Sequence, residues 1–185
     1  MYKNLFDKLD SRLEKGRTVL AIEGGSASGK TTLADLLKQR YDATVFHTDD
    51  FFLQPHQRTP ERFAEVGGNL DRERFLSEVL TPLKEGKTIE YKRFDCSAMT
   101  LTEAEIITPK KLVIIEGAYS MHPAFRECYD LSVFLDISKA LQRERILKRN
   151  PVRAQRFFDE WIPLEDRYFD KMQIKQKCDM VIEIK

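Results

Sequence analysis

The residues with the clearest chemical meaning form a glycine- and serine-rich segment near the N-terminus. Residues 24–31 read GGSASGKT and fit the pattern G-x-x-x-x-G-K-[ST]. Glycines allow a tight turn that points several N–H groups into one concavity, and the helix that follows adds its positive end. Lys30 would reach the β- and γ-phosphates of ATP, and the Thr31 hydroxyl would hold Mg²⁺. The predicted ATP-binding residues are Gly24, Gly25, Ser26, Ala27, Ser28, Gly29, Lys30, Thr31 and Thr32.

Acidic residues follow two apolar runs further along the chain. Asp49 and Asp50 come after one run, and Glu116 ends the run KLVIIE. In a parallel sheet the strand ends converge on the ligand crevice. A carboxylate there can hold a metal ion or accept the proton of an attacking hydroxyl. The alternative for Asp49 and Asp50 is that they cap a helix. We predict Glu116 and Thr31 as magnesium ligands and Asp49 as a catalytic residue.

Basic residues are concentrated between residues 143 and 156, most of them on one predicted helix. Arg145 and Arg149 are four positions apart and therefore share a face of that helix. Phosphoryl transfer spreads negative charge over the γ-phosphate oxygens, and a guanidinium group can hold two of them. The alternative is a solvated, charged helix face. Beside a phosphate loop, we predict that Arg145 and Arg149 are catalytic residues of a lid. The pattern leaves four other residues unassigned, namely Arg143, Lys148, Arg153 and Arg156.

These residues must be positioned by strands that alternate with helices. Apolar runs predict strands at Thr18–Glu23, Ala43–His47, Lys111–Glu116, Leu131–Asp136 and Met180–Ile184. Helical spacing of apolar residues predicts helices at Tyr2–Lys15, Lys30–Tyr41, Asp71–Leu83, Lys139–Arg149 and Arg153–Lys171. This alternation indicates an α/β fold whose parallel sheet is covered on both faces. Gln54–Asn69 is expected to be a long functional loop, and Thr88–Thr108 a small β excursion.

The composition sets the broad class of protein. The 185 residues suit a single domain spanning 1–185, and 42% hydrophobic residues suffice for one core. A net charge of +1 gives no general attraction to nucleic acid or anionic membranes. The three cysteines are far apart and odd in number, which favours a reducing compartment. No apolar run approaches the ~20 residues that span a bilayer. We expect a cytoplasmic protein without nucleic-acid or membrane partners.

The ordered motifs resemble the uridine kinase family, with its relatives nicotinamide riboside kinase and bacterial pantothenate kinase. The resemblance extends from Thr18 to Ile184. It is carried by IEGGSASGKTTLA (22–34), HTDDFF (47–52), NLDRERF (69–75), LVIIEGAYS (112–120) and LQRERILKRN (141–150). It implies a P-loop kinase-type three-layer fold with a five-stranded parallel sheet and a mobile helical lid. It also implies transfer of a phosphoryl group from ATP to a primary hydroxyl, the 5′-hydroxyl of a riboside in the nucleoside kinases.

The same resemblance implies individual roles. Asp49 aligns with the acid proposed as general base, and Asp71 with the acid that holds the ribose hydroxyls. Glu116 aligns with the acid near magnesium, and Arg145 and Arg149 align with lid arginines.

Aromatic residues are the candidates for the walls of the substrate pocket. Phe51 and the neighbouring Phe52 are such candidates, with buried packing as the alternative. Either Tyr91 or Phe94 takes the place of the aromatic residue that precedes a base-reading histidine in the pyrimidine kinases. No histidine follows here, and the chain offers Cys96 instead.

The expected function is that of an ATP- and Mg²⁺-dependent small-molecule kinase, similar to uridine kinase, that acts on a nucleoside-like hydroxyl acceptor. Uridine or cytidine as the acceptor is not supported. One alternative is an activity of the nicotinamide riboside or pantothenate kinase type. The alternative from a different class is a nucleotide-binding regulator with weak ATPase activity. The oligomeric state stays open, a homo-oligomer included.

Overall fold

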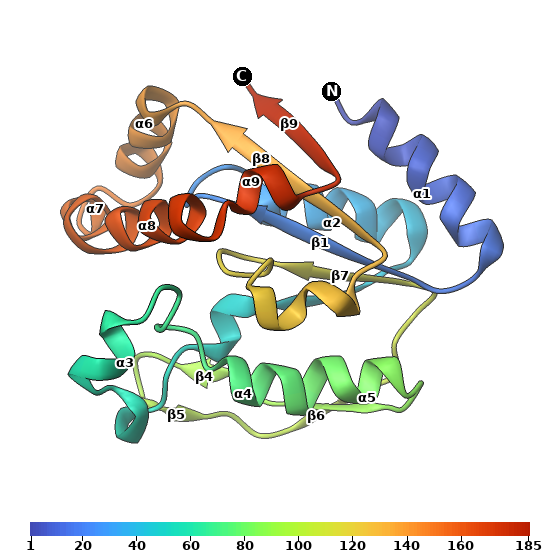
Figure 1. Cartoon of the computed structure of the whole chain (residues 1–185), viewed down its shortest axis with the longest axis horizontal. Coiled ribbons are helices and arrows are strands. Elements are labelled where there is room, and N and C mark those ends of the chain that lie inside the picture. Colours follow the sequence, from blue (N-terminus) through green and yellow to red (C-terminus); the bar gives the residue numbers. More distant parts are fainter.

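Five parallel strands form the centre of the computed structural model, which describes all residues from Met1 to Lys185 (Figure 1). The strands of this sheet are β1 (Thr18–Gly24), β2 (Thr44–His47), β7 (Leu112–Glu116), β8 (Leu131–Ile137) and β9 (Met180–Ile184). Their spatial order is β2-β7-β1-β8-β9. Leu20 of β1 pairs with Ile114 on one side and Leu131 on the other. The loop after β1 therefore starts at the middle of the sheet edge, and the predicted five-stranded parallel fold is confirmed.

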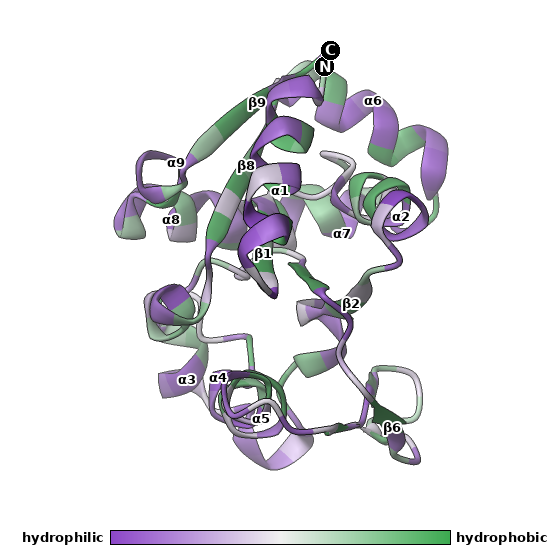
Figure 2. Ribbon diagram, turned by 90° about the vertical axis from the view of Figure 1, so that its right-hand side faces the viewer, coloured by the Kyte–Doolittle hydropathy of each residue, from purple (hydrophilic) through white to green (hydrophobic).

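Successive side chains of the strands enter two different cores, because they alternate between the faces of the sheet. Leu20 packs in a core with helices α1 (Lys3–Lys15) and α2 (Lys30–Tyr41). Ala21 packs on the other face, in a core that includes Tyr168 of helix α8 (Ile162–Met172). Figure 2 shows the resulting pattern, with hydrophobic central strands and a largely hydrophilic outer side on α1. Both faces are buried, which explains the near-continuous apolar runs of these strands.

The remaining helices agree with the sequence-based prediction in position, but not in regularity. They are α3 (Pro60–Ala64), α4 (Arg72–Phe75), α5 (Thr81–Lys84), α6 (Lys139–Arg149), α7 (Ala154–Arg156) and α9 (Ile174–Lys177). A π-helical turn, Leu76–Leu80, joins α4 to α5, and another, Phe157–Trp161, joins α7 to α8. Each of the predicted helices Asp71–Leu83 and Arg153–Lys171 is therefore one helix with a wider turn inside it. None of the helices is both long and apolar enough to cross a lipid bilayer.

The segment predicted as a long loop, Gln54–Asn69, is partly helical, so that prediction was wrong in part. Helix α3 begins inside it, and the Thr59 hydroxyl caps this helix by accepting a hydrogen bond from Arg62 N at 3.2 Å. Pro60 occupies the first helical position, where its missing N–H costs nothing. The Thr-Pro pair is a start signal for a helix that the loop interpretation overlooked.

Two short antiparallel strand pairs confirm the β excursion predicted at Thr88–Thr108. Strand β3 (Ile89–Tyr91) pairs with β6 (Glu105–Ile107), and β4 (Phe94–Asp95) pairs with β5 (Thr100–Leu101). Together with α3, α4 and α5 they form a lobe below the main sheet in Figure 1. This lobe faces the edge of the sheet at which the acidic residues were predicted to gather.

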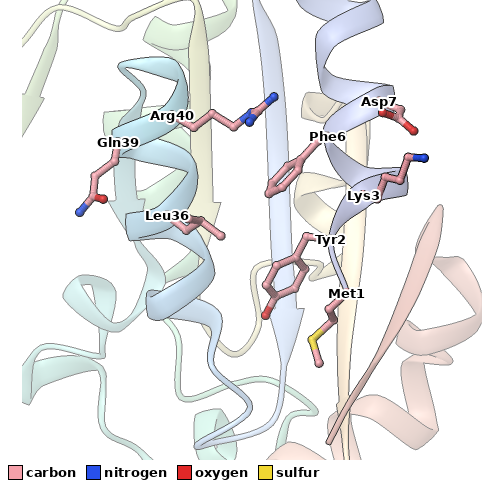
Figure 3. A pocket seen from close by; sticks show the side chains of 8 residues that line it. All are labelled: Met1, Tyr2, Lys3, Phe6, Asp7, Leu36, Gln39 and Arg40. Carbon is pink, nitrogen blue, oxygen red and sulfur yellow. The ribbon is translucent and has the colours of Figure 1, made fainter.

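Helix α1 is fastened to α2 by polar and aromatic contacts as well as by the core. The Arg40 guanidinium lies 4.8 Å from the centre of the Phe6 ring and 3.7 Å from the Asp10 carboxylate. The Tyr41 hydroxyl donates a hydrogen bond to Asp10 at 2.7 Å. Figure 3 shows the shallow groove between the two helices, with Phe6 and Arg40 turned toward each other across it. These contacts hold α1 against α2 on the outer side of the sheet.

We expect Leu20→Ala to lower the free energy of unfolding by about 2–5 kcal/mol, because this fully buried side chain fills the core beside the central strand. Urea denaturation measures the change. Leu36→Ala on α2 serves as the control, because Leu36 is 41% exposed. Its effect should stay within about 0.5 kcal/mol. Similar losses for both variants would contradict the central position of β1.

Candidate active site

The segment between β1 and α2 folds into a loop that leaves backbone N–H groups available. Ser28 N donates to Gly25 O at 3.1 Å, which closes the turn. Ala27 (φ 62°) and Gly29 (φ 95°) adopt left-handed conformations, and such residues in a turn direct successive N–H groups into one concavity. Helix α2 begins at Lys30 without a side chain that caps it. The first N–H groups of α2 are thus free to bind an anion.

Gly24 is required at the start of the loop because strand β8 lies against it. A Cβ atom at this position would be 2.7 Å from the carbonyl oxygen of Leu135 and 2.9 Å from the hydroxyl of Ser28. Its φ of 148° also disfavours any other residue. The absence of a side chain at the first glycine of the motif therefore allows the loop to pass close to strand β8.

The Lys30 ammonium group lies across the loop, as the motif predicts. Its Nζ donates hydrogen bonds to the carbonyl oxygens of Gly24 at 2.9 Å and Gly25 at 3.1 Å. The positive charge is therefore held beside the uncapped end of α2, where phosphate groups would lie.

Three side chains from neighbouring elements meet at the end of β7. The Thr31 hydroxyl donates a hydrogen bond to Glu116 Oε1 at 3.1 Å, and His47 Nδ1 lies 2.5 Å from the same oxygen. The sheet brings them together, because β7 lies between β1 and β2. Thr31 and Glu116 were both predicted as magnesium ligands, whereas no motif assigns a role to His47. Only the pairing of β2 with β7, which sets His47 opposite Glu116, reveals its role.

The Glu116 carboxylate remains charged although it is buried. Burial acts to raise its pKa, but the hydrogen bond with His47 and the charges of His47 and Lys30 lower the pKa below its usual value. The same hydrogen bond raises the pKa of His47. An anionic carboxylate next to a hydroxyl oxygen is the kind of oxygen donor set that Mg²⁺ prefers. Thr31 and Glu116 thus fit the metal that the motif predicts.

Asp49 lies in the cleft between the sheet and the lobe, on the 3₁₀ turn Thr48–Phe51 that follows β2. Its pKa is raised to about 6, because the cleft walls desolvate the carboxylate and three neighbouring acids repel its charge, while Lys30 opposes the increase. Asp49 is nevertheless exposed to solvent, so the increase comes from the walls of an open cleft and not from enclosure in the core. An acid with this pKa can exchange a proton near neutral pH.

Asp50 has a different environment from Asp49, although the two residues are adjacent. The Tyr91 hydroxyl donates a hydrogen bond to Asp50 at 2.6 Å, and the Arg93 guanidinium lies 3.7 Å from it. Asp50 therefore holds the β3 segment against the turn, and only the first of the two acids faces the cleft.

Four residues that were predicted to contact the substrate are buried and do not line the cleft. Phe51 is fully buried and packs against Phe75 and Tyr91. Tyr91 is 2% exposed, and Phe94, which lies beneath Arg58, is 4% exposed. Burial of these three aromatic rings in the lobe stabilises it and withdraws them from the acceptor.

Asp71, the fourth of these residues, is used within the lobe itself. It caps α4 by accepting a hydrogen bond from Arg74 N at 3.1 Å, and it lies 3.6 Å from the Arg74 guanidinium. The side chain is 2% exposed and does not line the cleft. The neighbouring Asn69 and Phe52 line it instead.

The cleft has a volume of about 1580 Å³, and the remaining predicted residues line it except Gly24 and Gly25. The phosphate loop and the α6–α8 arm, residues 139–172, line one side of it. The lobe lines the other side, with side chains that include Phe52, Arg58 and Cys96. A cleft of this size between a phosphate loop and a separate lobe can hold a nucleotide and a second small molecule.

Arg145 and Arg149 of α6, the predicted lid arginines, both line the cleft. Arg145 donates a hydrogen bond to the Ala27 carbonyl at 3.3 Å, and Arg149 lies over the Phe157 ring. Of the unassigned basic residues, Lys148 and Arg156 line the cleft. Arg143 instead stacks on Phe158, with its guanidinium 4.4 Å from the ring centre.

Two buried glutamates beside the loop were not predicted. Glu23 accepts hydrogen bonds from Gly24 N and Met121 N, both at 2.9 Å, and burial raises its pKa to about 7. Glu165 of α8 accepts hydrogen bonds from the backbone and the hydroxyl of Ser26. Glu23 lies just before the G-x-x-x-x-G-K-[ST] pattern, Glu165 belongs to no motif, and the partner of Glu165 is 139 positions away. Local spacing carries no signal for such a contact.

A phosphate loop on the central strand, an acid at the end of the neighbouring strand and an arginine-bearing arm over one cleft define a P-loop phosphotransferase. The model of the phosphoribulokinase/uridine kinase family matches residues 19–156, and the chain belongs to that family. It is therefore a phosphotransferase that uses ATP and acts on a hydroxyl group of a small molecule. The predicted resemblance to the uridine kinase family is confirmed.

Individual relatives agree with this assignment. Uridine kinase of Staphylococcus aureus is 26% identical over 187 residues, which cover 91% of this chain and 88% of that protein. The solved structure of a possible uridine kinase from Bacillus stearothermophilus has a TM-score of 0.69 and 23% identity. The match covers 97% of this chain and 99% of that one, so the two share a fold over their whole length.

We expect Asp49→Asn to lower kcat by about a hundredfold or more, the loss typical of a missing general base. The affinity for ATP should change little, because Asp49 faces the acceptor side of the cleft. Steady-state kinetics at saturating ATP measure the effect. Asp50→Asn is the matched control, since Asp50 is turned toward Tyr91. A variant at position 49 that loses ATP affinity but keeps its kcat would make Asp49 a nucleotide ligand.

The rate should also depend on pH through Asp49. A base acts only in its deprotonated form, so kcat/KM should fall as the pH decreases through about 6, the pKa to which Asp49 is raised. A pH profile of the wild type measures this acidic limb. The residual activity of Asp49→Asn should lack it. An unchanged limb in that variant would assign the titration to another group.

Proposed function

We propose that this chain transfers the γ-phosphoryl group of Mg-ATP to a primary hydroxyl of a nucleoside-like acceptor. The observation that carries the proposal is the placement of Asp49 in the cleft that the phosphate loop lines. Lys30 lines the same cleft as Asp49. An acceptor hydroxyl between them would have its proton near a carboxylate and its oxygen near the γ-phosphate.

The residues of the chain divide the work of transfer. The free N–H groups at the start of α2 and Lys30 bind and orient the phosphates, which holds the reacting groups in line. Arg145 and Arg149 are placed to meet the negative charge that spreads over the γ-phosphate oxygens as the bond to ADP breaks. Asp49 accepts the proton from the acceptor hydroxyl.

Magnesium would be held by the Thr31 hydroxyl and the Glu116 carboxylate, directly or through water. When bound there, it would neutralise charge on the β- and γ-phosphate oxygens. His47 keeps Glu116 anionic and oriented through its hydrogen bond. This is the usual role of an outer partner to a metal-binding carboxylate.

The acceptor side of the cleft has no histidine, the residue that reads the base in the pyrimidine kinases. If the edge of the base found no partners, its buried polar groups would stay without hydrogen bonds, and each would cost about 1–3 kcal/mol of binding free energy. Cys96 lines the cleft, but a thiol is a weak donor and a weak acceptor. Lys92 and Arg93 do not line the cleft and pair instead with carboxylates, Glu90 at 2.8 Å and Glu105 at 3.4 Å. They are therefore poor substitutes for a base-reading histidine.

Arg58 is the basic residue that the lobe presents to the acceptor. Its Nε donates to the Leu53 carbonyl at 2.9 Å, which orients the guanidinium, and its terminal amino groups have no protein partner. A fixed guanidinium group suits an anionic or carbonyl-rich acceptor better than cytosine. This favours an anionic acceptor, such as one of the pantothenate type, over the neutral nucleosides uridine and cytidine.

We expect uridine and cytidine to be modest substrates in a panel of nucleosides and vitamins assayed with Mg-ATP by ADP formation. Another riboside or hydroxyl compound should be preferred. A kcat/KM for uridine that is highest in the panel and within about 10⁴–10⁸ M⁻¹s⁻¹ would defeat this expectation, though not the kinase assignment. Slow ADP formation independent of every acceptor would instead favour the nucleotide-binding regulator.

Two arginine variants sharpen this test. Arg58→Ala should raise KM for the preferred acceptor by roughly tenfold, the loss typical of one charge-assisted hydrogen bond. Arg93→Ala is the matched control, because Arg93 is bound to acids outside the cleft. Equal effects of the two variants would remove Arg58 from the acceptor site.

A further inference from the structure

Helix α8 reaches the phosphate loop through one carboxylate. The backbone N–H of Ser26 donates to Glu165 Oε2 at 2.8 Å, and the Ser26 hydroxyl donates to Oε1 at 2.6 Å. Both oxygens of Glu165 are therefore used on a single residue of the loop. The side chain is buried, with 5% of the residue exposed. Hydrogen bonds to a buried, charged acceptor are stronger than neutral ones and define the geometry of their donors.

The Glu165 carboxylate holds the loop from the side and does not occupy the position that a bound phosphate would take. An anion bound by the loop would take the N–H groups at the start of α2, from Lys30 onward, which no side chain caps. Glu165 takes the N–H of Ser26, four residues before α2 begins. It thus satisfies an N–H group that faces α8 and leaves the phosphate position open.

Neighbouring contacts hold the same part of the loop from other directions. Gln142 of α6 donates to the Ser26 carbonyl at 3.0 Å, so both sides of this residue are fixed. One turn along α8 from Glu165, the Tyr168 hydroxyl donates at 3.1 Å to Glu23, which binds Gly24 N. Residues three apart on a helix share a face, so one face of α8 holds the loop at two points.

We propose that Glu165 is a positioning residue that pre-organises the phosphate loop for nucleotide binding. Without Glu165, the N–H and the hydroxyl of Ser26 would each lose their hydrogen-bond acceptor, and the loop would populate other conformations. The nucleotide would then bind only the fraction of molecules whose loop is competent. The apparent dissociation constant increases as that fraction decreases. The proposal concerns the nucleotide alone and does not depend on which acceptor is phosphorylated.

Titration calorimetry with Mg-ADP tests this role in the full chain, without any acceptor. Glu165→Ala should weaken Mg-ADP binding about tenfold, the change expected if a tenth of the molecules keep a competent loop. Glu165→Gln should restore binding to within about threefold, because the amide can accept from Ser26 N and donate to its hydroxyl. A mainly structural role would lower the thermal midpoint and leave the affinity of the folded protein unchanged, which would overturn the proposal.

The matched control lies one residue away on the same helix. Asp166 pairs with Lys139 of α6 at 2.5 Å and does not contact the loop. Asp166→Ala should leave Mg-ADP affinity unchanged. If Asp166→Ala weakened Mg-ADP binding as much as Glu165→Ala does, the effect would come from any contact that holds α8 and not from the contact with the loop. The proposal would then fail. Tighter binding by Glu165→Ala would also overturn it, because the carboxylate would then compete with the nucleotide.

A second variant keeps the test decisive if Glu165→Ala does not fold. Ser26→Ala removes only the hydroxyl contact and leaves the backbone N–H bound to Glu165. We expect a weakening of Mg-ADP binding of about two- to threefold, in line with one lost hydrogen bond of about 0.5 kcal/mol. Wild-type affinity in Ser26→Ala would count against the proposed role of Glu165.

Discussion

The phosphate loop must keep a row of backbone N–H groups without protein partners, and much of the structure serves that constraint. Unpaired N–H groups and left-handed residues such as Ala27 are unfavourable, and they persist only where the surroundings fix them. The neighbours supply this fixation. Strand β8 packs on Gly24, Gln142 and Glu165 hold Ser26, and Glu116 holds Thr31. The parallel sheet makes these contacts possible by placing all the strand ends at one edge.

The carboxylates around Lys30 differ in pKa although burial acts on all of them. Burial alone dominates at Glu23, whose pKa is raised to about 7, and the cleft walls dominate at Asp49, at about 6. Glu116 forms a hydrogen bond with His47, and its pKa is lowered. Environments that separate the pKa values of neighbouring acids allow them to take different roles. The arrangement suits one acid as a permanent anion and another as a proton acceptor.

Most of the fold was predictable from the sequence, because its signals are local. The loop motif and the apolar runs of β1 and β7 depend on neighbouring residues. The direction of side chains after a strand is not local. On the turn after β2, Asp49 and Phe52 line the cleft, whereas Asp50 and Phe51 between them face the lobe. A motif fixes the order of these four residues and not which two face the ligand, which is why the predicted aromatic contacts failed.

The same distinction separates the two halves of the cleft. Binding of phosphates depends on backbone geometry within one continuous segment, so a short motif is sufficient to predict it. The acceptor half is assembled from side chains of separate segments, among them Arg58, Cys96 and Trp161. Its chemistry is decided by which charges are already neutralised, as Arg93 is by Asp50 and Glu105. Which charges are neutralised depends on contacts across the lobe. A short sequence motif can therefore predict the type of reaction but not the choice of acceptor.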